Sequence, residues 1–350
     1  MEPGRPGAAR STPCGWRVSL LYPDFLIIGA QKAGTTWLQR NLQTHPEIWM
    51  PPEKELHYFD EKARLEGGLL QRLRGDEPAD RRWRRQAKSR FKQSPGKIDP
   101  QDLLWDLKYF FGRPDDAWYA SLFERGGGKI TGETTPDYSI LDQDRVAHAH
   151  HLMPHAKIVF MMRSPLERPW SAMDMGLRIK GRSWESLKEE KVYKRFDRGR
   201  TRLMTNYLLT LKNWGSYYPE DRIFVGFLED IHFFPEELLR RLHDFLGVDS
   251  AAEHRVMKRK IHSGFQDTMP AKFAAYLAGS YHENIKRLSE RFGGYASFWL
   301  YCAERLIEDP PTEDRLAYPL YESYLWESWD GAKDLAPQSG PLSTVRAASS

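Results

Sequence analysis

Three apolar runs of strand length alternate with segments of helical periodicity along the chain. The apolar runs occupy residues 24–29, 156–162 and 222–228. Segments with helical spacing of apolar positions occupy residues 36–42, 144–154 and 235–246. Continuous apolar runs are typical of strands that are covered on both faces, and strands that alternate with helices favour parallel pairing through crossovers. The pattern therefore predicts an α/β fold of three layers, with a central, mostly parallel sheet flanked by helices.

Segments outside this alternation divide the chain into regions. Residues 1–20 are rich in Pro, Gly, Ala and Arg, lack the apolar core of a signal peptide, and are predicted to form a flexible leader. We expect one domain over residues 21–310, which includes a basic insertion at residues 72–99. Residues 311–350 are predicted to be an extension that ends in a mobile tail of small residues from Gly340 onward.

Composition narrows the class of protein and its compartment. Lys and Arg number 52 against 48 Asp and Glu, for a formal net charge of +4. This excess suits anionic ligands but is too small to indicate a nucleic-acid partner. No stretch approaches the ~18 apolar residues of a membrane span. Cys14 and Cys302, the two cysteines of the 350 residues, do not make a disulfide framework. We expect a cytoplasmic protein with no membrane span and no nucleic-acid partner.

The first strand is followed by a glycine-containing loop at residues 29–36, Gly-Ala-Gln-Lys-Ala-Gly-Thr-Thr. Backbone N–H groups at the start of a helix form an anion site, which the helix dipole strengthens. Gly34 permits close approach of an oxyanion, Thr35 and Thr36 add hydroxyl donors, and Lys32 adds a charge. The Gly-x4-Gly spacing matches a nucleotide P-loop, but Thr35 stands where that motif has Lys. We predict a P-loop-like phosphate site here; a turn without a ligand is the alternative.

The loop resembles the 5′-phosphosulfate-binding loop of the sulfotransferases that use 3′-phosphoadenosine-5′-phosphosulfate (PAPS). This resemblance implies that PAPS is the sulfuryl donor. It also implies a set of residues that bind the 5′ end of the donor: Lys32, Ala33, Gly34, Thr35, Thr36 and Trp37.

A second motif ends the second apolar run at residues 160–171, Phe-Met-Met-Arg-Ser-Pro-Leu-Glu-Arg-Pro-Trp-Ser. An Arg at the carboxyl end of a parallel strand faces the ligand crevice, and Ser171 follows Arg163 by eight residues, inside the next helix. The segment resembles the family's 3′-phosphate-binding motif, which implies that Arg163 and Ser171 hold the 3′-phosphate. The planar guanidinium fork suits that task. The alternative is an Arg163 that ends its strand in an ion pair.

A third motif, Lys-Glu-Leu-His-Tyr-Phe-Asp at residues 54–60, resembles the Glu-x-His-Phe-Phe-Asp segment of heparan sulfate sulfotransferases. Glu55, His57 and Asp60 match position for position, and Tyr58 replaces one Phe. The resemblance implies that Glu55 is the catalytic base. His57 is the rival base, because its ordinary pKa is closer to neutrality. A solvated charged turn is the structural alternative.

Taken together, the three motifs resemble a PAPS-dependent sulfotransferase, closest to the heparan sulfate and carbohydrate branch in a soluble, bacterial-type form. The implied reaction moves a sulfuryl group from PAPS to a hydroxyl acceptor, which is predicted to be carbohydrate-like; a lipid headgroup or a small metabolite is also compatible. Lys32 would neutralise the leaving phosphate, and no metal is required. Residues 258–264 are a candidate late donor contact. The sequence does not indicate the oligomeric state.

Three other interpretations remain open at this stage. Glu229 and Asp230 after the third strand could hold Mg²⁺ in a P-loop kinase or NTPase, although the Gly-Lys-Ser/Thr signature is missing. A non-catalytic nucleotide-binding module would share the fold. The basic insertion, with Trp83 and Phe91, could contact nucleic acid, attract an acidic acceptor, or be a solvated helix. A histidine cluster lacks the partners of a metal site and is interpreted as a helix face: His148, His150, His151 and His155.

Overall fold

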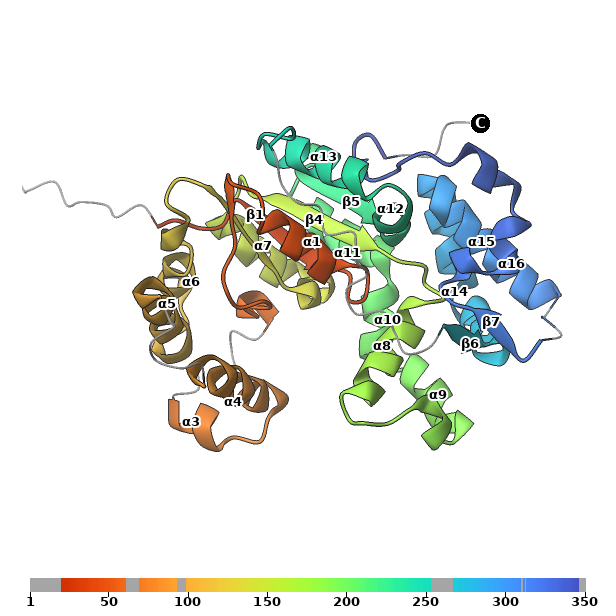
Figure 1. The fold of residues 1–350 in the computed structure, drawn as a ribbon, viewed down its shortest axis with the longest axis horizontal. Coiled ribbons are helices and arrows are strands. Elements are labelled where there is room, and N and C mark those ends of the chain that lie inside the picture. Colours follow the sequence, from red (N-terminus) through yellow and green to blue (C-terminus); the bar gives the residue numbers. More distant parts are fainter. Residues whose placement is uncertain are drawn as a thin grey trace, which may run out of the picture.

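A central sheet organises the computed structural model, which describes residues 20–60, 69–92, 99–252, 267–309, 311 and 313–345. Six strands lie in the order β2-β3-β1-β4-β5-β8 (Figure 1). Neighbouring strands are parallel except for β8, which runs antiparallel to β5. In chain order the strands of this sheet are β1 (Phe25–Gly29), β2 (Ile48–Trp49), β3 (Ile130–Thr134), β4 (Lys157–Met162), β5 (Ile223–Phe227) and β8 (Gly340–Pro341).

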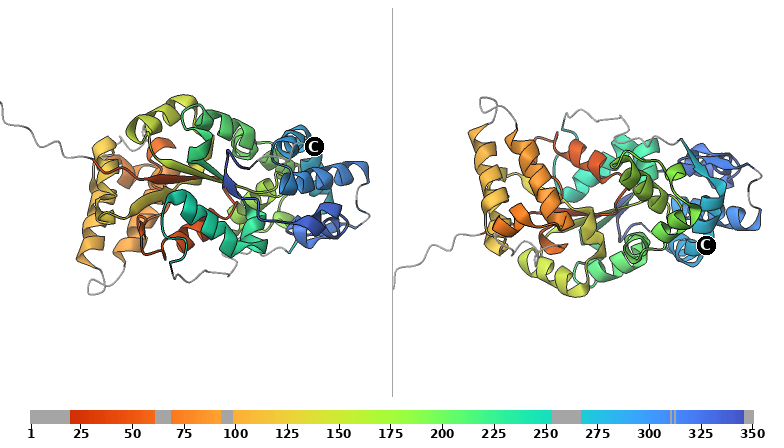
Figure 2. Two further views of the ribbon diagram at one scale, coloured as in Figure 1. Left: turned by 90° about the horizontal axis from the view of Figure 1, so that it is seen from above. Right: turned by 90° about the horizontal axis from the view of Figure 1, so that it is seen from below.

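Helices cover both faces of the sheet, as the two perpendicular views make plain (Figure 2). One face carries α1 (Thr35–Leu42), α12 (Leu228–Phe233) and α13 (Pro235–Leu246), and the other carries α7 (Gln143–Leu152) and α11 (Tyr207–Gly215). Every residue of β1 and β5 is buried because helices lie on each side. The predicted three-layer α/β fold with a mostly parallel sheet is confirmed.

Two groups of helices extend the sheet at opposite ends of the molecule (Figure 1). One end carries α3 (Leu69–Arg74), α4 (Pro78–Phe91), α5 (Pro100–Phe111) and α6 (Asp116–Ser121), of which α4 and the last three residues of α3 fall within residues 72–99. The other end carries α14 (Ala271–Phe292), α15 (Gly294–Glu308), α16 (Tyr324–Glu327) and the small sheet of β6 (Thr268–Pro270) and β7 (Arg315–Ala317). Between them are α8 (Arg168–Arg178), α9 (Glu189–Phe196) and α10 (Gly199–Thr205). No helix in the described ranges is long and apolar enough to cross a bilayer.

The end of the chain differs from the sequence-based expectation. The tail expected to be mobile from Gly340 instead forms β8, and the Leu342 N–H donates to the Ile223 carbonyl at 2.7 Å. Leu342 and Val345 are buried. The pairing with β8 satisfies backbone hydrogen-bonding groups on the exposed edge of β5. The small-residue composition of the tail does not indicate this pairing. The prediction of a mobile tail is therefore corrected for residues 340–345; residues 346–350 lie outside the described ranges.

Candidate functional site

The loop from β1 to α1 presents backbone donors at the carboxyl edge of the sheet. Gly34 precedes α1 with φ +87°, and a Cβ there would lie 2.3 Å from Ile231 Cδ1, so the position requires glycine. The first intrahelical bond is donated by the Leu38 N–H to the Gly34 carbonyl. The preceding N–H groups, including those of Thr35 and Thr36, therefore have no acceptor within α1 and can bind an anion.

Two ammonium groups lie at this loop. Lys32 Nζ is 3.5 Å from Met175 Sδ, and burial together with the charge of Arg163 lowers the pKa of Lys32 to about 8. Lys54 Nζ donates to Thr36 Oγ1 at 2.7 Å. Sequence reasoning quoted Lys54 as part of a motif but gave it no role. Its position shows that the third motif folds back onto the phosphate loop.

Arg163 joins the first two motifs. Its Nη1 lies 3.2 Å from both Ser171 Oγ and the carbonyl oxygen of Lys32. Its Nε donates to Glu167 at 2.8 Å, and its Nη2 donates to the hydroxyl of Tyr318. Arg163 does end its strand in an ion pair, as the structural alternative expected, and the same side chain also contacts both predicted phosphate-binding segments.

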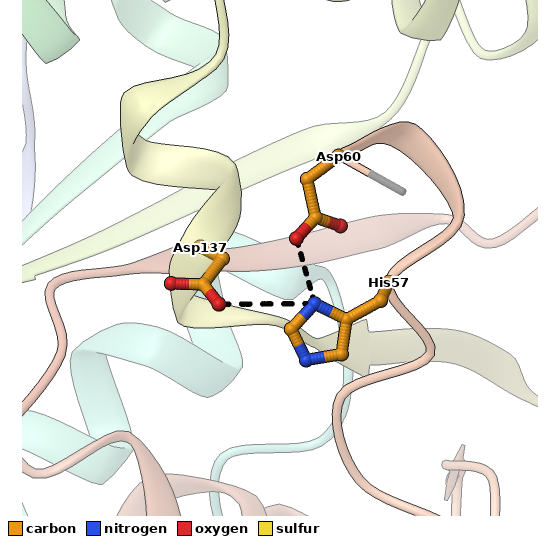
Figure 3. Close-up of side chains that lie close together, drawn as sticks. All are labelled: His57, Asp60 and Asp137. Atoms are coloured by element: carbon orange, nitrogen blue, oxygen red, sulfur yellow. Dashed lines mark hydrogen bonds and ion pairs between the residues drawn. The ribbon is translucent and has the colours of Figure 1, made fainter. Parts of the chain in front are cut away.

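His57 lies among three carboxylates, those of Glu55, Asp60 and Asp137; Figure 3 shows His57 with Asp60 and Asp137. His57 Nδ1 is 2.7 Å from Asp60 and 3.8 Å from Asp137, while His57 Nε2 is 3.6 Å from Glu55. Burial alone would lower the pKa of His57, but its bonds to Asp60 and Glu55 outweigh burial and raise that pKa to about 10. His57 is thus a cation at neutral pH and is poorly suited to be the base.

The same network sets the charge of Glu55. Burial alone would raise the pKa of Glu55, but the contact with His57, 3.6 Å away, and the charge of Lys54 lower it. Lys54 Nζ lies 3.6 Å from Glu55 Oε1. The Glu55 side chain is 38% exposed, so an ionised carboxylate at this position is accessible to a reacting hydroxyl.

Backbone strain coincides with these side chains. Among the residues that the structure describes, three other than glycine have a positive φ: Lys32 at 74°, Glu55 at 65° and His57 at 55°. Such conformations cost roughly 1–3 kcal/mol each and gather at functional sites. These three residues are also the ones for which the motifs predict a catalytic role, and that role stays a prediction.

The His57, Asp60 and Asp137 side chains also have the composition of a metal site, because their ligand atoms lie within 4.8 Å of one another. In the structure these side chains form ion pairs, His57 with Asp60 and Asp137 with Arg200. Asp137 is a member of this group that sequence reasoning missed, because it lies far along the chain from the motif at residues 54–60.

The carboxylates of the acidic pair after β5 are bound by residues of the C-terminal elements. Glu229 accepts from Trp299 Nε1 at 2.6 Å, and Asp230 accepts from Tyr295 and from the backbone and hydroxyl of Ser339. Both carboxylates are buried among C-terminal elements. A kinase or NTPase needs such a carboxylate beside its magnesium ion, so these contacts disfavour that interpretation.

The other residues that the sequence analysis singled out lie in the core, in a separate ion pair, or outside the described ranges. Ala33 and the Trp37 side chain are buried in the core, so only their backbones can contact a ligand. His148 Nε2 lies 3.0 Å from Asp116 rather than in a histidine cluster. Residues 258–264 fall outside the described ranges. Tyr318 and Glu167 were missed; the spacing of four residues between Arg163 and Glu167 could have indicated that pair, whereas no local pattern indicates Tyr318.

A mostly parallel sheet flanked by helices, with a glycine-containing loop between β1 and α1, defines a P-loop-like α/β protein. The chain belongs to the sulfotransferase family, whose family model matches residues 23–252. A crystal structure of a sulfotransferase from Alicyclobacillus acidocaldarius is similar in fold, with a TM-score of 0.51 and 23% identity, over 76% of this chain and 94% of that one.

Two curated proteins are similar over part of the chain. The membrane-associated sulfotransferase kil1 of Dictyostelium discoideum is 26% identical over 152 residues, which are 43% of this chain and 22% of that protein. Carbohydrate sulfotransferase 15 of Mus musculus is 27% identical over 166 residues, which are 43% of this chain and 26% of that protein. The chain therefore spans about a quarter of the length of each relative.

Proposed function

We propose that this protein transfers a sulfuryl group from PAPS to a hydroxyl group of a carbohydrate-like acceptor, with Glu55 as the general base. Membership of the sulfotransferase family supports sulfuryl transfer. The observation that carries the choice of donor is the position of Arg163, within 3.2 Å of both Ser171 and the Lys32 carbonyl. This contact brings two phosphate-binding segments together, as a nucleotide with phosphates at both its 3′ and 5′ positions requires.

The donor groups of the site fit that nucleotide. Helix amides, two hydroxyls and the Lys32 ammonium surround the loop, and the Arg163 guanidinium stands beside Ser171. These are hydrogen-bond donors that match phosphate oxygens. When bound, PAPS supplies the sulfuryl group and a phosphate leaving group. Lys32 holds a positive charge where that phosphate would gain negative charge.

Glu55 is positioned to take the proton of the acceptor hydroxyl. Lys54 connects it to the loop, since Lys54 Nζ contacts both Thr36 and Glu55. His57, held as a cation by Asp60, fixes the other side of the carboxylate. A carbohydrate acceptor is supported by the motif at residues 54–60 and by the name of the mouse relative.

Replacing Glu55 by Gln tests the base. We expect turnover with PAPS to fall at least about a hundredfold, because general-base catalysis is worth that much or more. Binding of adenosine 3′,5′-bisphosphate, measured by calorimetry, should stay within about twofold because Gln preserves the shape of the side chain. Glu185→Gln, a change at an exposed carboxylate, is the control and should keep full turnover. Equal activity of the Glu55 variant and the unmodified protein would assign the base elsewhere.

Replacing Arg163 by Lys tests the 3′-phosphate contact. Lys keeps the charge but loses the planar fork, so affinity for adenosine 3′,5′-bisphosphate should fall about tenfold or more. Affinity for adenosine 5′-phosphate should change far less. Arg240→Lys, at an exposed position, is the matched control. Equal losses for the two nucleotides would refute the assignment of Arg163.

The same ligands separate the alternative functions. Thermal stabilisation by adenosine 3′,5′-bisphosphate together with sulfate transfer supports the proposal. Stabilisation by ATP and Mg²⁺ alone would support a kinase or NTPase. Binding of the bisphosphate without transfer to any of a mixed set of glycan, lipid and phenol acceptors would support a non-catalytic module.

A further inference from the structure

Exposed apolar side chains concentrate on the three helices α3, α4 and α5. Of the fourteen large hydrophobic residues exposed in the described ranges, eight lie between residues 69 and 111. They are Leu69, Leu70 and Leu73 on α3, Phe91 on α4, and Leu103, Leu104, Leu107 and Phe111 on α5. Such density on a small part of the surface is typical of an interaction site.

The exposed residues of α5 form one stripe. Leu103, Leu104, Leu107 and Phe111 follow helical spacing, and Leu104 and Phe111 are 62% and 52% exposed. The opposite face of α5 already packs into the core through Trp105, Tyr109 and Phe110. Within the described residues, the stripe is therefore apolar surface that stays largely uncovered.

A row of basic residues borders the stripe. The row consists of four exposed residues, Arg81, Arg85, Lys88 and Lys92. Because they are spaced by four, three and four positions, they share one face of α4 and its C-terminal end. Phe91, next to this row, lies 6.1 Å from Phe111 between ring centroids. The basic row and the apolar stripe thus meet at these two rings.

The other face of α4 adjoins the candidate active site. Arg82 and Gln86, on that face, line a small hollow together with Glu55 and His57. Gln86 also donates to Glu53 at 2.7 Å. Whatever binds the outer surface of the insertion is therefore held one helix away from the reacting carboxylate.

We infer that the stripe of α5 and the basic row of α4 dock the protein onto the surface of an anionic lipid bilayer. Apolar side chains beside Lys and Arg enter the boundary between headgroups and acyl chains to a depth of about 5–10 Å, while the cations attract anionic headgroups. A second copy of this chain fits less well. A two-fold interface would place the same basic row on both sides, where like charges repel.

Vesicle sedimentation tests this inference with the full-length protein. The protein should sediment with vesicles of phosphatidylcholine and phosphatidylglycerol, bind phosphatidylcholine alone much more weakly, and lose binding as NaCl is added. The pair Arg85→Gln and Lys88→Gln should weaken binding about thirtyfold, at about 1 kcal/mol per basic residue. Lys286→Gln with Arg287→Gln, a matched exposed pair on α14, should leave binding unchanged.

Apolar variants test the other half of the surface. Leu104→Ser with Leu107→Ser should weaken vesicle binding at least about tenfold, since each removes apolar area that enters the bilayer. Ile307→Ser, at an exposed position on α15, should not. Melting curves establish that the variants fold. Failure of the unmodified protein to bind anionic vesicles would overturn the inference. So would a concentration-dependent dimer, measured by light scattering, that the Leu104 and Leu107 changes abolish.

Discussion

Lys32 shows how a single residue can carry both strain and charge. Its φ of 74° turns the chain so that the side chain lies beside Met175 while the carbonyl accepts from Arg163. Burial and the nearby guanidinium disfavour the ammonium form and bring its pKa down to about 8. The free protein therefore loses this positive charge under mildly alkaline conditions.

The affinity for adenosine 3′,5′-bisphosphate should consequently depend on pH. Below a pH of about 8 the Lys32 ammonium attracts the ligand, and as the pH rises through about 8 the free protein loses that charge, so the dissociation constant increases. In Lys32→Arg, whose guanidinium stays protonated, the calorimetric dissociation constant should stay flat over the same range. An identical pH profile in the variant and the unmodified protein would show that another group titrates.

At the scale of elements, strands that are apolar throughout could be predicted and polar or short ones could not. The runs at residues 24–29, 156–162 and 222–228 correspond to β1, β4 and β5. β3 lies next to β1 yet contains Gly132 and Glu133, which hide it from any hydrophobic pattern. Glu133 is tolerated because Tyr119, Tyr138 and Thr135 donate to it, while burial raises its pKa to about 7.

β8 was not predicted because it is short and lacks an apolar run. The contact that holds it beside β5 can be tested. Ser339 Oγ donates to the buried carboxylate of Asp230 at 2.6 Å. Ser339→Ala removes this donor, so the free energy of unfolding should fall by about 1–3 kcal/mol. Ser328→Ala, at an exposed position in the same extension, should change stability by less than about 0.5 kcal/mol. Equal denaturant midpoints for all three proteins would show that β8 is not held by this contact.

For the molecule as a whole, local motifs predicted the parts of the site and folding supplied their connections. The phosphate loop, Arg163 with Ser171, and Glu55 were all proposed from short segments, and their roles stay predictions. Tyr318 and Asp137 were not proposed, because each reaches these residues from a distant segment of the chain. The cytoplasmic location and the boundary at residue 310 stay predictions, although the contact of Tyr318 with Arg163 joins the extension to the site.

The Tyr318 contact has a consequence for biosynthesis. A nascent chain that has emerged from the ribosome as far as β5 contains the whole parallel part of the sheet and the phosphate loop. It still lacks the hydroxyl that accepts from Arg163, and Glu167 still lacks the Leu320 amide that donates to it at 2.6 Å. The guanidinium therefore reaches its final set of partners only after translation has passed this extension, so the orientation of Arg163 is fixed late in the maturation of the polypeptide.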